Sequence, residues 1–125
     1  MSKLITKNEI NNAIERVNSL YIAKYNGFYF ESVFQPIIST VGYCLGFEAL
    51  VRIKELTAGE IINPHFFFQS LTSDIEATNF GMICFGIHVR NFSQSPHKTL
   101  KLFINTMPII FSSTYNTPSL IKQNP

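Results

Sequence analysis

The sequence predicts an α/β domain that opens with an N-terminal helix and continues with an antiparallel hairpin, two helices and a strand. Two patterns lead to this prediction. Apolar residues recur at helical spacing near the N-terminus and again in the second half of the chain. Segments rich in aromatic and β-branched residues, which favour strands, lie between and after them. With 125 residues, 46% of them hydrophobic, the chain is long enough for one domain with a single core.

The N-terminal helix is expected within residues 1–27. Thr6 and Glu9 have the Thr-x-x-Glu spacing of a capping box, in which each side chain satisfies the free backbone N–H of the other residue. Asn26 and Gly27 offer a left-handed cap at which a helix can end. The apolar stripe between these caps consists of Ile10, Ile14, Val17 and Tyr21.

Residues 28–39 and 43–53 are expected to form the two strands of the hairpin, because both are rich in aromatic and β-branched residues and a turn-like segment separates them. Pro36 is the weak point of the first strand. It lacks a backbone N–H, and it therefore predicts an edge position or the end of a strand.

Two helix starts are expected in the second half of the chain. Asn63 precedes Pro64, which is the pattern of an N-cap with proline at the first helical position. Ser73 and Glu76 form a second capping-box pattern. The polar residues 91–98 are expected to form the loop after this helix.

A short strand is expected at residues 101–105, and residues 111–125 are expected to be poorly ordered. The strand segment is apolar and is followed by a proline. The C-terminal segment is dominated by Ser, Thr, Asn and Pro.

The composition excludes several classes of function. The net charge is +2 without a Lys/Arg cluster, which excludes charge-driven binding to a nucleic acid polymer. The longest apolar runs are far shorter than the roughly 20 residues that span a membrane, and the N-terminus has no apolar signal segment. Cys44 and Cys84 lie outside any Cys-x-x-Cys motif, and we expect both to be reduced and buried in a cytoplasmic protein.

Glu48 and Arg52 place two charges in an otherwise apolar segment. Residues two apart on a strand share a face, so Glu48, Leu50 and Arg52 are expected to point to the same side. At a rise of about 3.3 Å per residue, the two charges lie about 13 Å apart and need separate partners. A divalent cation for the carboxylate and a phosphate for the guanidinium would fit, and the alternative is a solvated face. The core would lie on the other side, with Phe47, Ala49 and Val51.

Four blocks of the sequence resemble the EAL domain family, the bacterial cyclic di-GMP phosphodiesterases named after the tripeptide at residues 48–50. "FQPI" resembles the first strand of the family and "GFEALVR" its signature strand. "GEIINP" resembles the stretch that leads into the next helix, and "LFINTMP" resembles the strand that ends in the metal-binding Asn. The resemblance covers roughly residues 28–108 and implies a partial EAL domain at residues 28–110. The implied fold is the first half of a TIM-like (β/α)8 barrel.

The resemblance also implies a set of site residues. Glu48 and Asn105 would bind Mg²⁺ or Mn²⁺, whose preferred ligands include carboxylate and amide oxygens. Gln35, Leu50 and Arg52 would contact cyclic di-GMP, Arg52 through a phosphate. The implied reaction is metal-assisted attack of water on one phosphodiester bond, which yields the linear dinucleotide.

Simpler roles compete with some of these assignments. Asn105 could be a turn former at the end of a strand, and Gln35 could cap the backbone of the hairpin. His65, His88 and His97 lack metal-ligand spacing, and we expect them on the surface or at helix flanks.

The later motifs of the family do not appear, and residues 106–125 contain no Asp or Glu. Glu48 and Asn105 would therefore hold a metal ion weakly or not at all. We expect a truncated phosphodiesterase domain without catalytic residues of its own, inactive alone. The alternatives are a degenerate protein-interaction or regulatory module and a residual cyclic di-GMP-binding module. An exposed barrel edge would favour self-association or a protein partner.

Overall fold

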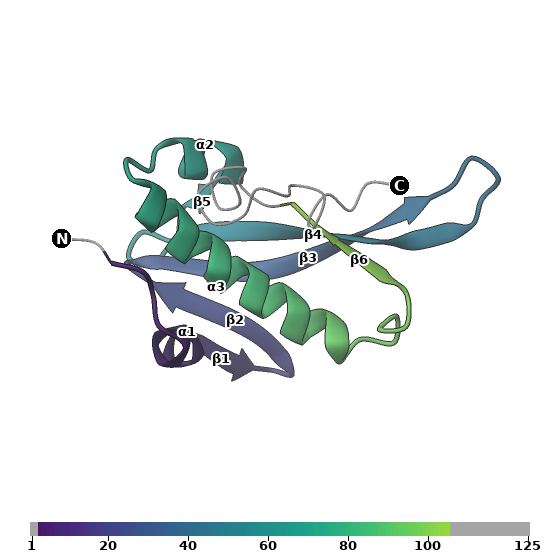
Figure 1. The fold of residues 1–125 in the computed structure, drawn as a ribbon, viewed down its shortest axis with the longest axis horizontal. Helices are drawn as coiled ribbons and strands as arrows, with labels where there is room; N and C mark the ends of the chain where they lie inside the picture. The colour runs from purple at the N-terminus through teal and green to yellow at the C-terminus, as the bar shows by residue number, and fades with distance from the viewer. Residues whose placement is uncertain (1–2, 106–125) are drawn as a thin grey trace.

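The computed structural model describes residues 3–105, which form a six-stranded sheet and three helices (Figure 1). The strands follow the order β1-β2-β3-β4-β5 with antiparallel pairing, and β6 pairs with β4 in parallel. The elements are α1 (Lys7–Ala13), β1 (Ile14–Val17), β2 (Leu20–Tyr25), β3 (Phe28–Ile38), β4 (Cys44–Glu55), β5 (Ile61–Ile62), α2 (Pro64–Gln69), α3 (Asp74–Ser93) and β6 (Lys101–Ile104).

The expected N-terminal helix over residues 1–27 is wrong beyond Ala13. The capping box at Thr6 is confirmed, and α1 begins there. The chain then forms the hairpin of β1 and β2, which turns at Asn18 and Ser19 with φ values of 50° and 71°. Positive φ at both turn residues matches the twist of a two-residue hairpin. The apolar stripe misled the prediction because Ile, Val and Tyr suit a strand as well as a helical face.

The expected fold, the first half of a TIM-like (β/α)8 barrel, is also wrong. Such a barrel consists of parallel strands that alternate with helices. Here β1 to β5 are joined by short turns, and a short turn brings the next strand back antiparallel to the one before. β4 and β6 are the single parallel pair within residues 3–105, and α2 and α3 form the crossover between them. The result is a mixed sheet in a small α/β domain.

The hairpin of β3 and β4 is confirmed and is the longest feature of the sheet. Its pairing runs from Phe28 opposite Glu55 to Ile38 opposite Cys44. β2 pairs with β3 only as far as Phe30, so β3 is an edge strand on that side at Pro36. The expected edge position of the proline is therefore confirmed, because a residue without an N–H fits where no neighbouring strand needs one.

Both expected helix starts are confirmed. The Asn63 side chain accepts hydrogen bonds from the N–H groups of His65 and Phe66 at 2.9 and 3.2 Å. The Ser73 side chain accepts one from the N–H of Glu76 at 3.0 Å. α3 continues to Ser93, so the loop expected from residue 91 begins later than the sequence indicated.

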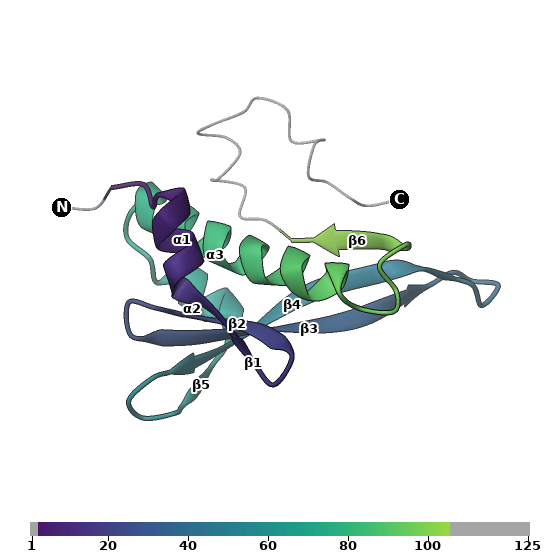
Figure 2. The ribbon, with the colours of Figure 1, turned by 90° about the horizontal axis from the view of Figure 1, so that it is seen from below.

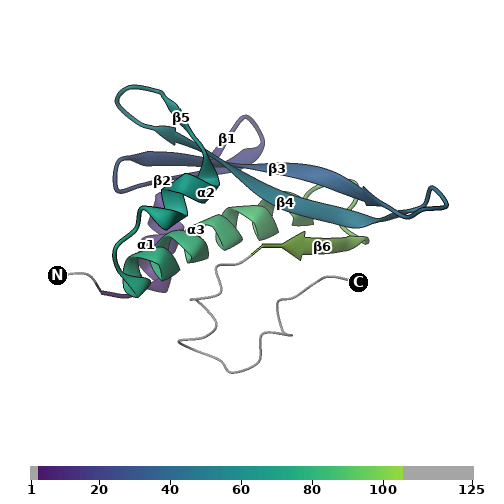
Figure 3. The same cartoon turned by 90° about the horizontal axis from the view of Figure 1, so that it is seen from above.

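The core lies between α3 and the sheet and is centred on aromatic side chains. Phe28 and Phe30 from β3 meet Phe67 from α2 and Phe80 from α3, with ring centroids 4.9–6.1 Å apart. Most of these pairs are edge-to-face, the arrangement that aromatic rings prefer. The three helices lie on the same side of the sheet (Figures 2 and 3), so the described elements leave its other face open.

Three further expectations concern burial and the chain ends. Cys84 is buried as expected, whereas Cys44 is exposed because it lies near the projecting end of the β3–β4 hairpin. The expected poorly ordered tail at residues 111–125 lies outside the described residues. Within residues 3–105, no helix is long and apolar enough to cross a membrane.

Candidate functional site

The two residues that the EAL resemblance assigns to a metal lie side by side. Glu48 is in the middle of β4, and Asn105 directly follows β6 at the carboxyl end of that strand. The parallel register pairs Glu48 with Phe103, which brings the Asn105 side chain toward the carboxylate. Asn105 Nδ2 donates a hydrogen bond of 2.6 Å to Glu48 Oε2, although 57 positions separate the two residues.

Gly46 allows this approach of β6 to β4. A Cβ atom at Gly46 would lie 2.5 Å from the carbonyl oxygen of Lys101 and 2.8 Å from Phe103 Cε2. The glycine of the "GFEALVR" segment therefore has a steric role, because any larger residue would push β6 away.

The donor set suits a hard cation but is small. Glu48 supplies a carboxylate, and Asn105 can supply its amide oxygen if the amide turns from its present orientation, in which the nitrogen faces Glu48. Mg²⁺ prefers about six oxygen ligands. Within residues 3–105, no three His, Cys, Asp or Glu side chains gather into a metal cluster. Most ligands of an ion bound here would come from water or from a bound phosphate.

Gln35 and Leu50 occupy the open face next to this pair. Gln35 on β3 is directly opposite Glu48 on β4, and Val33 is opposite Leu50. The expected alternation along β4 is confirmed, because Ala49 and Ile53 are buried in the core. Among the described residues, the Gln35 side chain has no hydrogen bond to the hairpin backbone, so the capping alternative gains no support.

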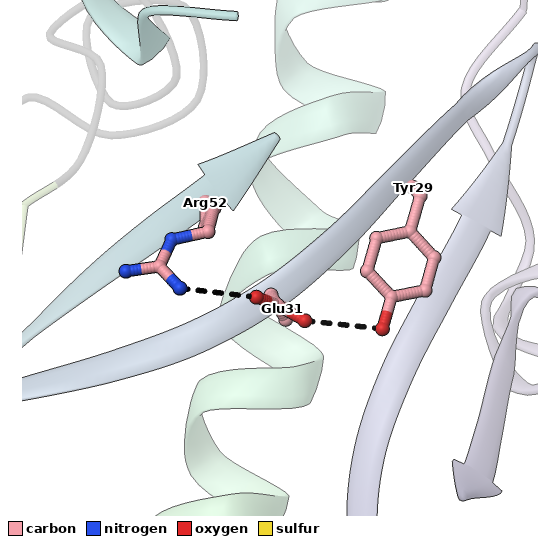
Figure 4. A network of polar contacts seen from close by, with 3 residues as sticks. All are labelled: Tyr29, Glu31 and Arg52. Atoms are coloured by element: carbon pink, nitrogen blue, oxygen red, sulfur yellow. Dashed lines mark hydrogen bonds and ion pairs between the residues drawn. The ribbon is translucent and has the colours of Figure 1, made fainter. Parts of the chain in front are cut away.

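Arg52 lies further along the same face and has an acidic partner (Figure 4). Arg52 Nη1 is 3.4 Å from Glu31 Oε1, and the Tyr29 hydroxyl donates a 3.0 Å hydrogen bond to Glu31 Oε2. Burial, followed by the hydrogen bond to Glu31, raises the pKa of Tyr29. The sequence prediction missed Glu31, whose position opposite Arg52 becomes visible only in the strand register.

The structure therefore brings together part of the predicted site. Glu48, Asn105 and Gln35 are neighbours, whereas four positions of β4 separate Glu48 from Arg52, about 13 Å at the rise of a strand. Arg52 borders a cavity of about 740 Å³ between β2, β3 and α3, and Asn105 borders a different one of about 660 Å³. A ligand that meets both residues must extend along the open face.

His88 is a buried residue that the sequence misplaced. Expected at a surface or helix flank, it is only 3% exposed, because α3 turns this position toward β3. Its Nδ1 atom is 2.8 Å from the hydroxyl of Ser32. Burial lowers the pKa of His88 to about 4.

The lowered pKa of His88 predicts that acid destabilises the fold. In the unfolded chain the imidazole binds a proton near its ordinary pKa of about 6.5, whereas the folded protein resists protonation down to about pH 4. Between about pH 6.5 and pH 4 the unfolded state therefore binds more protons than the folded state, and the stability decreases as the pH is lowered. We expect wild-type protein to lose about 2 kcal/mol more than His88→Phe between pH 7 and pH 5 in urea denaturation. His97→Phe, at an exposed histidine, is the control and should follow the wild type. Equal losses in wild type and His88→Phe would contradict the prediction.

Comparisons of the chain with protein-family models, curated proteins and solved structures found no match. The relationship to the EAL family stays a prediction from the four sequence blocks.

Proposed function

We propose that this chain is an EAL-type module that retains one wall of a cyclic di-GMP and metal site and does not hydrolyse the dinucleotide on its own. The single observation that carries the proposal is the Asn105–Glu48 hydrogen bond. A resemblance based on sequence blocks implied that both residues are metal ligands, and the two side chains are in contact across a parallel strand pair. A turn former at Asn105 would not need a carboxylate 57 positions away.

The absence of hydrolysis follows from the ligand count. Metal-assisted attack on a phosphodiester needs ions that generate hydroxide and neutralise charge on the phosphoryl oxygens. At this site the described residues offer one carboxylate, Glu48, and the amides of Asn105 and Gln35, too few charged ligands to fix such ions in place.

A metal titration tests the proposed ligands. We expect Mn²⁺ to broaden the NMR signals of Glu48 and Asn105 at millimolar concentrations, and we expect Glu48→Gln to weaken this binding about tenfold or more. Glu55→Gln, the same change at the end of the same strand, is the matched control and should behave like the wild type. Equal Mn²⁺ binding in the two variants would show that Glu48 is not a metal ligand.

Binding of cyclic di-GMP is tested by calorimetry and its hydrolysis by a product assay, both in the presence of Mn²⁺. Heat of binding that is lost in Arg52→Ala would support the proposed phosphate contact, and no linear dinucleotide should form. Absence of binding at high micromolar concentrations of cyclic di-GMP would contradict the proposed function. If the wild type hydrolyses cyclic di-GMP and Glu48→Ala abolishes this activity, the chain is active on its own. That result would contradict the proposed inactivity and would support the proposed site.

A protein-interaction module is a second candidate, favoured by the projecting end of the β3–β4 hairpin. Four large apolar side chains are exposed there: Ile38, Val41, Tyr43 and Leu45. This candidate predicts a concentration-dependent increase in mass in light scattering that Tyr43→Ser reduces and that Glu48→Ala and Arg52→Ala leave unchanged. A constant monomer mass would count against it.

A further inference from the structure

A cavity of about 660 Å³ lies between α2, α3, β4 and β6, on the helical side of the sheet. Its volume falls within the range of small-molecule pockets, about 300–1,000 Å³. Phe68 and Phe85 contribute aromatic surface, and Val51, Cys84 and Ile104 contribute apolar surface. The described residues that line it include no Asp, Glu, Lys or Arg. A charged ligand would lose its hydration without gaining a partner, so the lining favours an uncharged one.

His88 lines the same cavity and is held in one tautomer by a chain of hydrogen bonds. The chain starts at the backbone of Tyr21, whose N–H donates to Asn91 Oδ1 at 2.8 Å. This bond fixes the orientation of the Asn91 amide. Its Nδ2 group then donates to the carbonyl oxygen of Tyr21 at 2.8 Å and to the hydroxyl of Ser32 at 3.1 Å.

The hydroxyl of Ser32 accepts from Asn91, and among the described residues its own proton has no acceptor other than His88 Nδ1, 2.8 Å away, so we assign this proton to the Ser32–His88 hydrogen bond. A nitrogen that accepts a hydrogen bond carries no proton, so the proton of the neutral imidazole is on Nε2. Burial, which lowers the pKa of His88, keeps the ring neutral at pH 7. Among the described residues, Nε2 has no hydrogen-bond partner, which leaves one fixed donor for a molecule in the cavity.

We propose that this cavity binds an uncharged, planar heteroaromatic molecule whose ring carbonyl accepts a hydrogen bond from His88 Nε2. The aromatic walls favour a flat ring system, the absence of charged lining residues favours neutrality, and the tautomer selects an acceptor over a donor. This inference uses neither Glu48 nor Arg52, although Leu50 and Asn105 of the proposed cyclic di-GMP site also line the cavity.

Three probes of similar shape test the proposal on the full 125-residue chain by NMR titration. Coumarin carries a ring carbonyl and no donor, naphthalene carries neither, and 2-naphthoate carries a negative charge. We expect coumarin to bind about five- to tenfold more tightly than naphthalene, the gain of one well-placed hydrogen bond, and to shift the Nε2–H signal of His88. We expect 2-naphthoate to bind more weakly than naphthalene.

Variants assign the preference to His88. His88→Phe should bind coumarin and naphthalene equally, and the matched control His97→Phe, which is not among the lining residues, should keep the wild-type preference. If His88→Phe fails to fold by circular dichroism, Ser32→Ala serves instead, because it frees Nδ1 to take the proton and should reduce the preference. Equal binding of all three probes to the wild type, a preference that survives in His88→Phe, or no binding of coumarin would each overturn the proposal.

Discussion

Phe80→Ala is expected to lower the free energy of unfolding by about 3–5 kcal/mol, a large fraction of the stability of a domain of this size. Phe80 is 1% exposed, and its ring contacts those of Tyr25, Phe28, Phe30 and Phe67. Truncation would leave a cavity at the point where α2, α3 and the sheet meet. Neighbouring groups cannot easily close it, because the rings of Phe28 and Phe30 are also held by the ring of Phe67.

The matched control for this prediction is Phe85→Ala on the same helix. Phe85 is 51% exposed, so we expect a loss of about 1 kcal/mol or less. Both changes raise helix propensity by the same amount, and the difference between them therefore reports burial alone. Urea denaturation at pH 7 measures both values. Similar losses in the two variants would mean that the aromatic cluster is not the centre of the core.

Local signals in the sequence predicted where the helices begin. Thr6, Asn63 and Ser73 each start a helix where their capping patterns placed it, because a cap depends on residues within one turn. The alternation along β4 likewise predicted which face Glu48 and Arg52 occupy. These features need no information from distant parts of the chain.

The arrangement of the elements could not be predicted in the same way. The segment from Ile14 to Tyr25 is compatible with a helix or a hairpin, and the turn at Asn18 and Ser19 decides between them. The contacts of His88 with Ser32 and of Glu31 with Arg52 depend on which strands pair and which helix covers them. No local pattern in the sequence indicates these pairings. The prediction of a half-barrel was therefore wrong, and the structure is a mixed sheet.

Asn105 is intermediate between these cases. Its position at the end of a strand was visible in the sequence, but its contact with Glu48 requires that β6 lie against β4 in one particular register. The sequence encodes that register partly at Gly46, where the backbones come too close for a side chain. A single glycine inside a strand often marks such an approach.

Gly46→Ala is expected to detach β6 from β4 and to separate the proposed metal ligands without changing either of them. The new Cβ atom would lie 2.5 Å from the carbonyl oxygen of Lys101, a backbone atom that can move only if β6 moves. We expect a stability loss of about 1–3 kcal/mol. Hydrogen exchange should show faster exchange of the β6 amides, and Mn²⁺ should no longer broaden Asn105.

Gly42→Ala provides the control that separates the loss of β6 from a general loss of stability. Gly42 lies in the hairpin turn with φ of 92° and open space around it, so alanine there is strained but touches nothing. A comparable loss of about 1 kcal/mol is expected, with β6 protection and Mn²⁺ broadening unchanged. If both variants lose β6 protection equally, the strand is held by overall stability and not by the close approach at Gly46. If Gly46→Ala alone loses it and Mn²⁺ binding persists, the metal ligands lie elsewhere, and the Glu48–Asn105 pair is a structural hydrogen bond.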